Sequence, residues 1–115
     1  MLPQLQARAD LILTVLSYEH RLNGDVAQYK AIVQLVDGSR LHINEVWIAN
    51  ALHKYAYYRL TPTGALLQGW DNAPHHPHIS TYPHHIHTPS EIAQSLIRSL
   101  GDVLSELTRQ LLEYP

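Results

Sequence analysis

The sequence predicts an α+β domain in which about five antiparallel strands form a meander and a long C-terminal helix packs against the sheet. Three observations support this fold class. Residues 11–70 alternate apolar and polar side chains between closely spaced turn signals, which favours strands joined by hairpins. Residues 89–113 carry one apolar stripe at helical spacing. The chain of 115 residues has room for one core, so residues 1–115 are expected to form a single domain.

Short turn signals define the expected strands. Asn23-Gly24 and Asp37-Gly38 are two-residue hairpin signals, and the residues from Thr61 to Gly64 make a further turn. Between these turns the sequence predicts strands at residues 11–20, 26–36, 41–46, 53–60 and 65–70. Trp47 and Trp70 are expected to anchor the core or its edge.

The C-terminal helix is expected to begin after Thr88. Thr88 can act as the N-cap, Pro89 suits the first helical position, and Glu91 can complete a capping box. The apolar stripe that follows consists of Ile92, Leu96, Leu100, Val103, Leu107 and Leu111. This pattern predicts an amphipathic helix over residues 89–113.

Composition excludes some classes of site. There is no cysteine, so neither a disulfide nor a thiolate metal site can form. The N-terminus lacks the pattern of a secretory signal and no apolar run is long enough to cross a membrane, so we expect a cytoplasmic protein with no membrane partner. The net charge of −2 gives no overall attraction to nucleic acid.

Residues 71–88 form the expected functional loop. Six of the nine histidines lie between His75 and His87, and three prolines interrupt any central strand. Long loops in small domains are often functional. The loop starts with Asp71-Asn72 and leads to the expected helix N-terminus, where free N–H groups favour an anion such as phosphate.

Acid–base cleavage of RNA is one chemistry that this loop could support. The RNA 2′-hydroxyl attacks its own phosphate, so the enzyme needs a base, an acid and a nearby cation. The candidate catalytic residues are Asp71, Asn72, His75, His76, His84, His85 and His87. The candidate substrate-binding residues are Lys54, Tyr57 and Arg59, although a strand tyrosine more often packs in the core. Asp71-Asn72 can equally be a structural turn.

Metal binding is the alternative chemistry. His75, His85 and His87, with Asp71 as an acidic ligand, could hold Zn²⁺ with an open coordination position. No His-Glu-x-x-His helix is present, and acid–base cleavage requires no cofactor. The sequence therefore predicts either no cofactor or a divalent metal at these histidines.

The loop resembles the signature of the TumE-like family. The matching stretches run from Trp70 to Pro77 (WDNAPHHP) and from Thr81 to His87 (TYPHHIH). Residues 41–45 (LHINE) and 54–57 (KYAY) are also similar to the family's pattern, and the resemblance extends over about residues 11–113. One departure is Gly69, where the family often has an arginine.

This resemblance implies the toxin of a prokaryotic toxin–antitoxin pair. The implied partner is an antitoxin, commonly a helix-turn-helix protein, and general toxin biology suggests a nuclease that acts on RNA. If the family's arginine binds phosphate, Gly69 removes that contact. A metal-binding hydrolase and a non-catalytic interaction module remain alternatives, and an exposed sheet edge could pair two copies into a homodimer.

Overall fold

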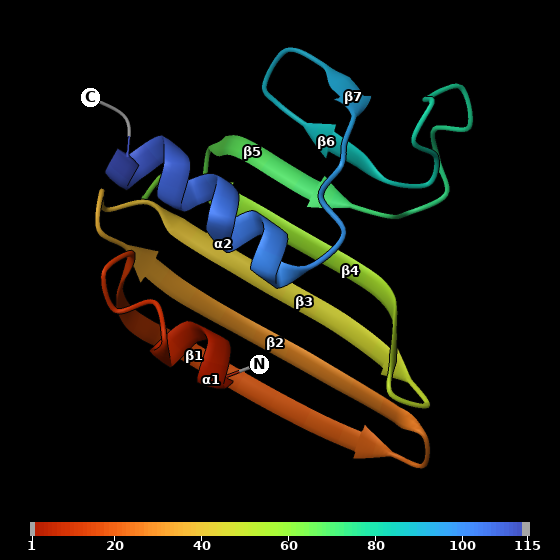
Figure 1. Ribbon diagram of the computed structural model, residues 1–115, viewed down its shortest axis with the longest axis horizontal. Coiled ribbons are helices and arrows are strands. Elements are labelled where there is room, and N and C mark those ends of the chain that lie inside the picture. Colours follow the sequence, from red (N-terminus) through yellow and green to blue (C-terminus); the bar gives the residue numbers. More distant parts are fainter. Residues whose placement is uncertain (1, 114–115) are drawn as a thin grey trace.

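The computed structural model describes residues 2–113 and contains one antiparallel sheet whose seven strands follow the order of the chain (Figure 1). The meander comprises β1 (Ile12–Asn23), β2 (Val26–Leu35), β3 (Arg40–Ile48), β4 (Ala51–Leu60) and β5 (Leu66–Asp71). Two short strands, β6 (His85–His87) and β7 (Ile92–Gln94), extend it. The helices are α1 (Leu2–Gln6) and α2 (Leu100–Thr108), which continues as the π-helical turn η1 (Arg109–Glu113). The protein is therefore mainly β.

The hairpin turns explain why the five-strand meander was predictable. Gly24 and Gly38 have φ angles of +60° and +90°, a backbone conformation that glycine adopts without strain. The turn between β3 and β4 has no glycine to mark it in the sequence. Ala49 and Asn50 adopt the positive φ angles there, at 49° and 66°. The five predicted strands therefore lie close to β1 to β5, although the sequence leaves the turn between β3 and β4 undefined.

The predicted start of the helix at Pro89 is wrong. Thr88 and Glu91 instead close the turn between β6 and β7: the Thr88 N–H donates to the Glu91 carbonyl at 2.9 Å, and the Glu91 N–H donates to Thr88 Oγ1 at 3.2 Å. Helix α2 begins only at Leu100, where the Ser99 hydroxyl accepts a hydrogen bond from the Asp102 N–H at 3.2 Å. The predicted long helix is thus short, and the loop expected over residues 71–88 includes β6.

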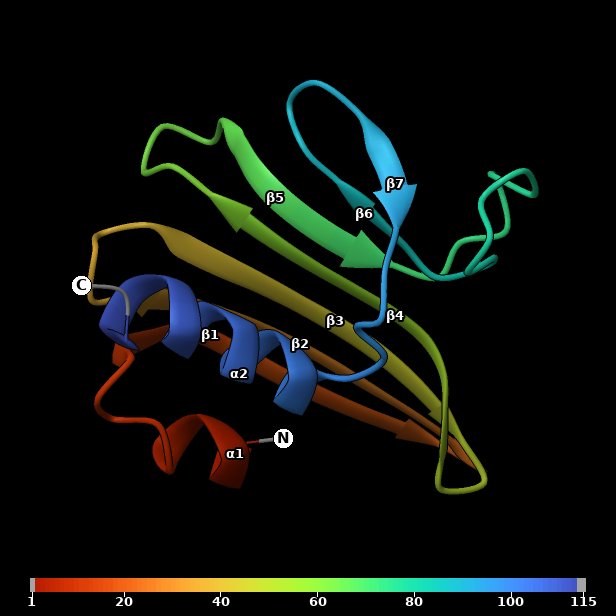
Figure 2. The ribbon, with the colours of Figure 1, turned by 45° about the horizontal axis from the view of Figure 1, so that its top comes forward.

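Both helices lie on the same face of the sheet, as Figures 1 and 2 show. Leu100, Val103, Leu104 and Leu107 of α2 are buried. They belong to one core with inward side chains of the sheet, including Val33, Leu41, Ile43, Tyr57 and Trp70. We call this side of the sheet the helix face and the opposite side the open face. Because strand side chains alternate, the neighbours of these core residues lie on the open face.

Among residues 2–113, no helix is long and apolar enough to cross a membrane.

Candidate functional site

Two rows of directly paired residues cross the open face and end at the histidine-rich segment. The first row consists of Glu19, Lys30, Asn44, Ala56, Asp71 and His85. The second row consists of Ser17, Ile32, His42, Tyr58, Gly69 and His87. Paired residues of neighbouring strands point to the same face. The sheet register therefore brings Asp71, Tyr58, His85 and His87 together, although they come from three strands.

The buried carboxylate of Asp71 is the centre of this group. Its Oδ1 lies 2.8 Å from His85 Nε2 and accepts a hydrogen bond from the Ala73 N–H at 3.0 Å. Its Oδ2 lies 3.1 Å from His87 Nε2 and accepts a hydrogen bond from the Tyr58 hydroxyl. Burial and the Asp71 carboxylate raise the pKa of Tyr58, so this hydroxyl stays protonated and acts as the donor. Asp71 therefore orients both imidazoles.

The protonation of His85 follows from its two neighbours. Its Nδ1 lies 2.8 Å from the carbonyl oxygen of Pro83, which can only accept, so Nδ1 carries a proton. Its Nε2 faces the Asp71 carboxylate and also lies 2.9 Å from His87 Nε2. A lone pair on Nε2 would repel that carboxylate. Nε2 is therefore the nitrogen at which His85 contacts both Asp71 and His87, and a hydrogen bond from His87 or a bound cation would separate it from the carboxylate.

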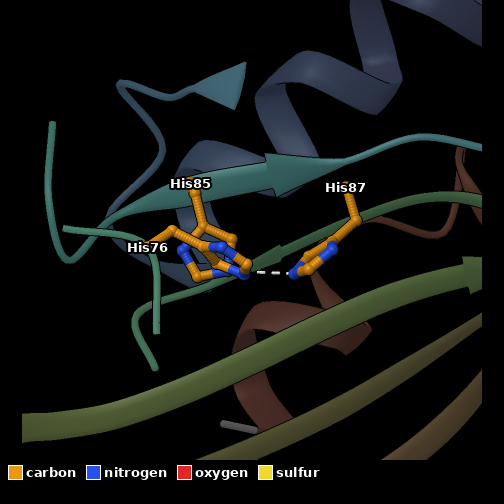
Figure 3. A group of neighbouring side chains, drawn as sticks. All are labelled: His76, His85 and His87. Carbon is orange, nitrogen blue, oxygen red and sulfur yellow. Dashed lines mark hydrogen bonds between the residues drawn. The ribbon is translucent and has the colours of Figure 1, made fainter. Parts of the chain in front are cut away.

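His76 completes the group, and Figure 3 shows its ring beside those of His85 and His87. The ring centroids lie 4.9 Å from His85 and 6.0 Å from His87, both in edge-to-face arrangements. Each of the three histidines offers one nitrogen within 4.8 Å of the others. Desolvation lowers the pKa of His76, and electrostatic repulsion from the neighbouring histidines lowers it further. We call Asp71, His76, His85 and His87 the Asp–His cluster.

Two predicted histidines lie outside the Asp–His cluster. His84 points to the helix face, where its Nδ1 lies 2.7 Å from the Tyr55 hydroxyl. That hydroxyl donates to the Ile97 carbonyl at 3.0 Å, so His84 is the donor to Tyr55. Burial, and then Arg98, lowers the pKa of His84. His75 is exposed, and the three histidines whose nitrogens lie close enough together to hold a metal ion are His76, His85 and His87, with His76 in the place predicted for His75.

Asn72 has a structural role. Its Oδ1 accepts from the Tyr55 N–H at 3.0 Å, and its Nδ2 donates to the His53 carbonyl at 3.1 Å. These two bonds attach the chain after β5 to the start of β4. Both polar atoms of the Asn72 side chain are thus engaged with the backbone of β4, and a catalytic role for Asn72 stays a prediction.

The predicted substrate-binding residues separate into two groups. Lys54 is exposed on the open face. Tyr57 is fully buried on the helix face and donates to Glu45 at 2.5 Å, so it cannot contact substrate. Arg59 pairs with Asp37 at 2.6 Å and donates to Ser39 and Gln68, which leaves it a structural cation. Only Lys54 of the three remains available to a ligand.

Tyr58 was not among the predicted site residues, and Gly69 was noted only as a departure from the family's pattern. A Cβ atom at Gly69 would lie 2.2 Å from Cδ1 of Tyr58, so the ring of Tyr58 occupies the space above this glycine. From there its hydroxyl reaches Asp71. An arginine at position 69 would meet the same ring. Glycine at position 69 therefore does more than remove a possible phosphate contact. The absence of a side chain makes room for the ring of Tyr58.

The substitution Gly69→Ala is expected to destabilise the protein by about 1–3 kcal/mol, because the new methyl group overlaps the Tyr58 ring. Urea unfolding measures this cost. In a Tyr58→Ala background, where the overlap is absent, the same substitution should cost much less. An equal cost in both backgrounds would show that the contact with Tyr58 is not the reason for glycine at this position.

Comparison with known proteins gives one match, a family model described as Toxin TumE, which aligns with residues 4–111. No curated protein and no solved structure is significantly similar to the chain. The family match includes every residue of the Asp–His cluster and all seven strands. Because it covers nearly the whole sequence, the chain belongs to the TumE family of toxins, and this role implies an antitoxin partner.

Proposed function

We propose that this toxin cleaves RNA by acid–base catalysis at the Asp–His cluster. The observation that carries the proposal is the buried carboxylate of Asp71, which contacts Nε2 of both His85 and His87 while Nδ1 of His85 is engaged by Pro83. RNA supplies its own nucleophile, the 2′-hydroxyl. A base and an acid held in place are then the main requirements for cleavage.

The environments of the histidines suggest which one acts as base and which as acid. His76 has a lowered pKa, so it is neutral near pH 7 and suited to take the proton of the 2′-hydroxyl. Nε2 of both His85 and His87 faces the Asp71 carboxylate, which holds the two rings in place. His87 is the more accessible of the two, with 23% of its side chain exposed against 2% for His85. His87 is therefore assigned as the acid.

The reaction conserves its protons. The 2′-oxygen forms a bond to phosphorus as His76 takes its proton, and the bond from phosphorus to the 5′-oxygen breaks as His87 donates a proton to that oxygen. The products are a 2′,3′-cyclic phosphate and a 5′-hydroxyl. Asp71 and His85 are positioning residues in this scheme, because they orient His87 without contacting the reacting atoms.

A metal-dependent hydrolase is the second candidate, and one observation favours it. Nitrogens of His76, His85 and His87 lie within 4.8 Å of one another, and the Asp71 carboxylate contacts two of these rings. The bond from His85 Nδ1 to a backbone carbonyl is the kind of second contact that orients metal-ligating histidines. Zn²⁺ fits this donor set best, since it accepts imidazole and carboxylate ligands in open sites.

Cleavage with and without a chelator distinguishes the two candidates. Protein without an affinity tag, purified without a metal column, should cleave RNA equally well before and after treatment with EDTA, and its products should carry a cyclic phosphate. Elemental analysis should find well under one zinc ion per chain. Loss of activity in EDTA with recovery on addition of zinc would favour the metal-dependent reaction. Growth arrest by protein that cleaves no RNA, with or without zinc, would contradict the ribonuclease proposal.

A further inference from the structure

A groove on the open face leads to the Asp–His cluster. It has a volume of about 520 Å³ and crosses β1 to β4, where Lys30, Ile32, His42, Asn44 and Tyr58 form part of its lining. Tyr58 marks the end nearest the cluster, since its hydroxyl donates to Asp71. A smaller hollow of about 90 Å³, lined by Gln28 and Lys54, shares Asn44 and Ala56 with the groove. The two hollows therefore adjoin on the open face, and the groove ends at Tyr58, which contacts the Asp–His cluster through Asp71.

The open face is positively charged although the chain as a whole is negative. Register and alternation place four cations on it, namely Arg21, Lys30, Arg40 and Lys54. All four are exposed, and within residues 2–113 only the carboxylates of Glu19 and Asp71 share the face with them. The rest of the chain carries four cations and eight carboxylates. A polyanion would therefore be attracted to the open face and repelled elsewhere.

We propose that this groove binds a single strand of RNA and delivers it to the Asp–His cluster, an inference that rests on the proposed ribonuclease function. Lys30 and Asp71 belong to the same row of paired residues and are three strand spacings apart, about 14 Å. Lys30 contacts the phosphate backbone near the middle of the groove. A single strand fits better than a duplex, because Ile32, His42 and Tyr58 offer apolar and aromatic surface to unstacked bases.

Binding of a non-cleavable probe tests the groove without requiring catalysis. The probe is a fluorescein-labelled 2′-O-methyl RNA strand of about ten nucleotides, whose blocked 2′-oxygen cannot attack the phosphate. Fluorescence anisotropy measures its Kd with the full-length wild type, with Lys30→Gln and with Arg109→Gln. The last variant is the matched control, because Arg109 is an exposed cation on η1, outside the open face. Thermal unfolding confirms that all three proteins are folded.

Lys30→Gln is expected to weaken binding several-fold and to lower the slope of log Kd against log salt by about 0.7, the value for one phosphate contact on a single strand. Arg109→Gln should bind like the wild type. Equal effects of the two substitutions would overturn the groove as the binding site. Tighter binding of duplex than of single-stranded RNA would overturn the assignment of the ligand.

The proposed ribonuclease function and the groove can fail separately. If the probe binds through Lys30 but natural RNA is never cleaved, the groove stands and the catalytic proposal is wrong. If RNA is cleaved and Lys30→Gln changes neither Kd nor the salt dependence, the catalytic proposal stands and the groove is wrong. If the wild type binds no RNA and Lys30→Gln abolishes binding of the antitoxin, the groove is a protein interface and the inference is overturned.

Discussion

Replacing His87 by alanine is expected to lower RNA cleavage by about a hundredfold or more, because the substitution removes the proposed general acid. The side chain is partly exposed beside Tyr58, with a distance of 6.0 Å between ring centroids, and its Nε2 lies 3.1 Å from Asp71 Oδ2. Its removal leaves the Asp71–His85 contact intact. The rate of cleavage of a labelled RNA and the growth of an expressing bacterial host both measure the effect.

His84→Ala is the matched control for this substitution. His84 belongs to the same His-His-x-His motif, but its imidazole contacts Tyr55 on the helix face rather than Asp71. This variant should retain cleavage within a fewfold of wild type and lose some stability, because a hydrogen bond to a partly buried hydroxyl is absent. Equal activity of His87→Ala and wild type, or equal loss in both variants, would contradict the assigned site.

The contrast between these two histidines shows how far the sequence alone can define the site. Asp71, His76, His85 and His87, which lie together in the structure, were all among the predicted residues. The motif could not separate His84 from His87, because that separation depends on the face to which each side chain points. The alternation in His85-Ile86-His87 is that of a strand, yet the neighbouring prolines favoured a loop. Pairing of β6 with β5 decides the orientation.

The predicted C-terminal helix starts too early for a related reason. The spacing of Ile92 and Leu96 fits a helical stripe that continues through Leu100 and Leu107. In the structure Ile92 pairs with His87 in the β6–β7 hairpin, and Leu96 is 85% exposed in the connection to α2. The periodicity of apolar residues describes their spacing along the chain, but it does not show whether a segment pairs with a neighbouring strand. A short strand that pairs within the sheet therefore displaced the local helix signal.

Tyr58 and Gly69 show what no local pattern could reveal. The sequence marked Gly69 only as a departure from the family's pattern, and its contact with Tyr58 exists because β4 and β5 pair in one register. Tyr58 lies over Gly69 and thereby reaches Asp71. The charge of the open face is similarly invisible in the overall net charge, because the register of β1 to β4 gathers four cations on that side. Register thus carries functional information beyond the strand assignments.

The substitution Trp70→Ala is expected to cost about 3–5 kcal/mol of the free energy of unfolding, which is a large part of the stability of a typical small domain. Trp70 is 2% exposed and has the largest side chain among the fully buried residues. It pairs with Tyr57 on β4 and Ile86 on β6, so its indole supports the sheet where the site is built. Removing it leaves a cavity beneath the strands that carry Asp71 and His85. Urea unfolding followed by circular dichroism measures the loss.

Leu22→Ala provides the control for this prediction, because Leu22 lies on β1 with 70% of its surface exposed and its truncation should change stability by less than about 0.5 kcal/mol. Trp70→Phe should fall between the two, since the smaller ring fills part of the cavity. If Trp70→Ala and Leu22→Ala cost the same, the core beneath the site does not depend on the indole. If Trp70→Ala is strongly destabilised but its folded fraction still cleaves RNA at the wild-type rate, the pairing of β5 with β6 holds the Asp–His cluster without the indole.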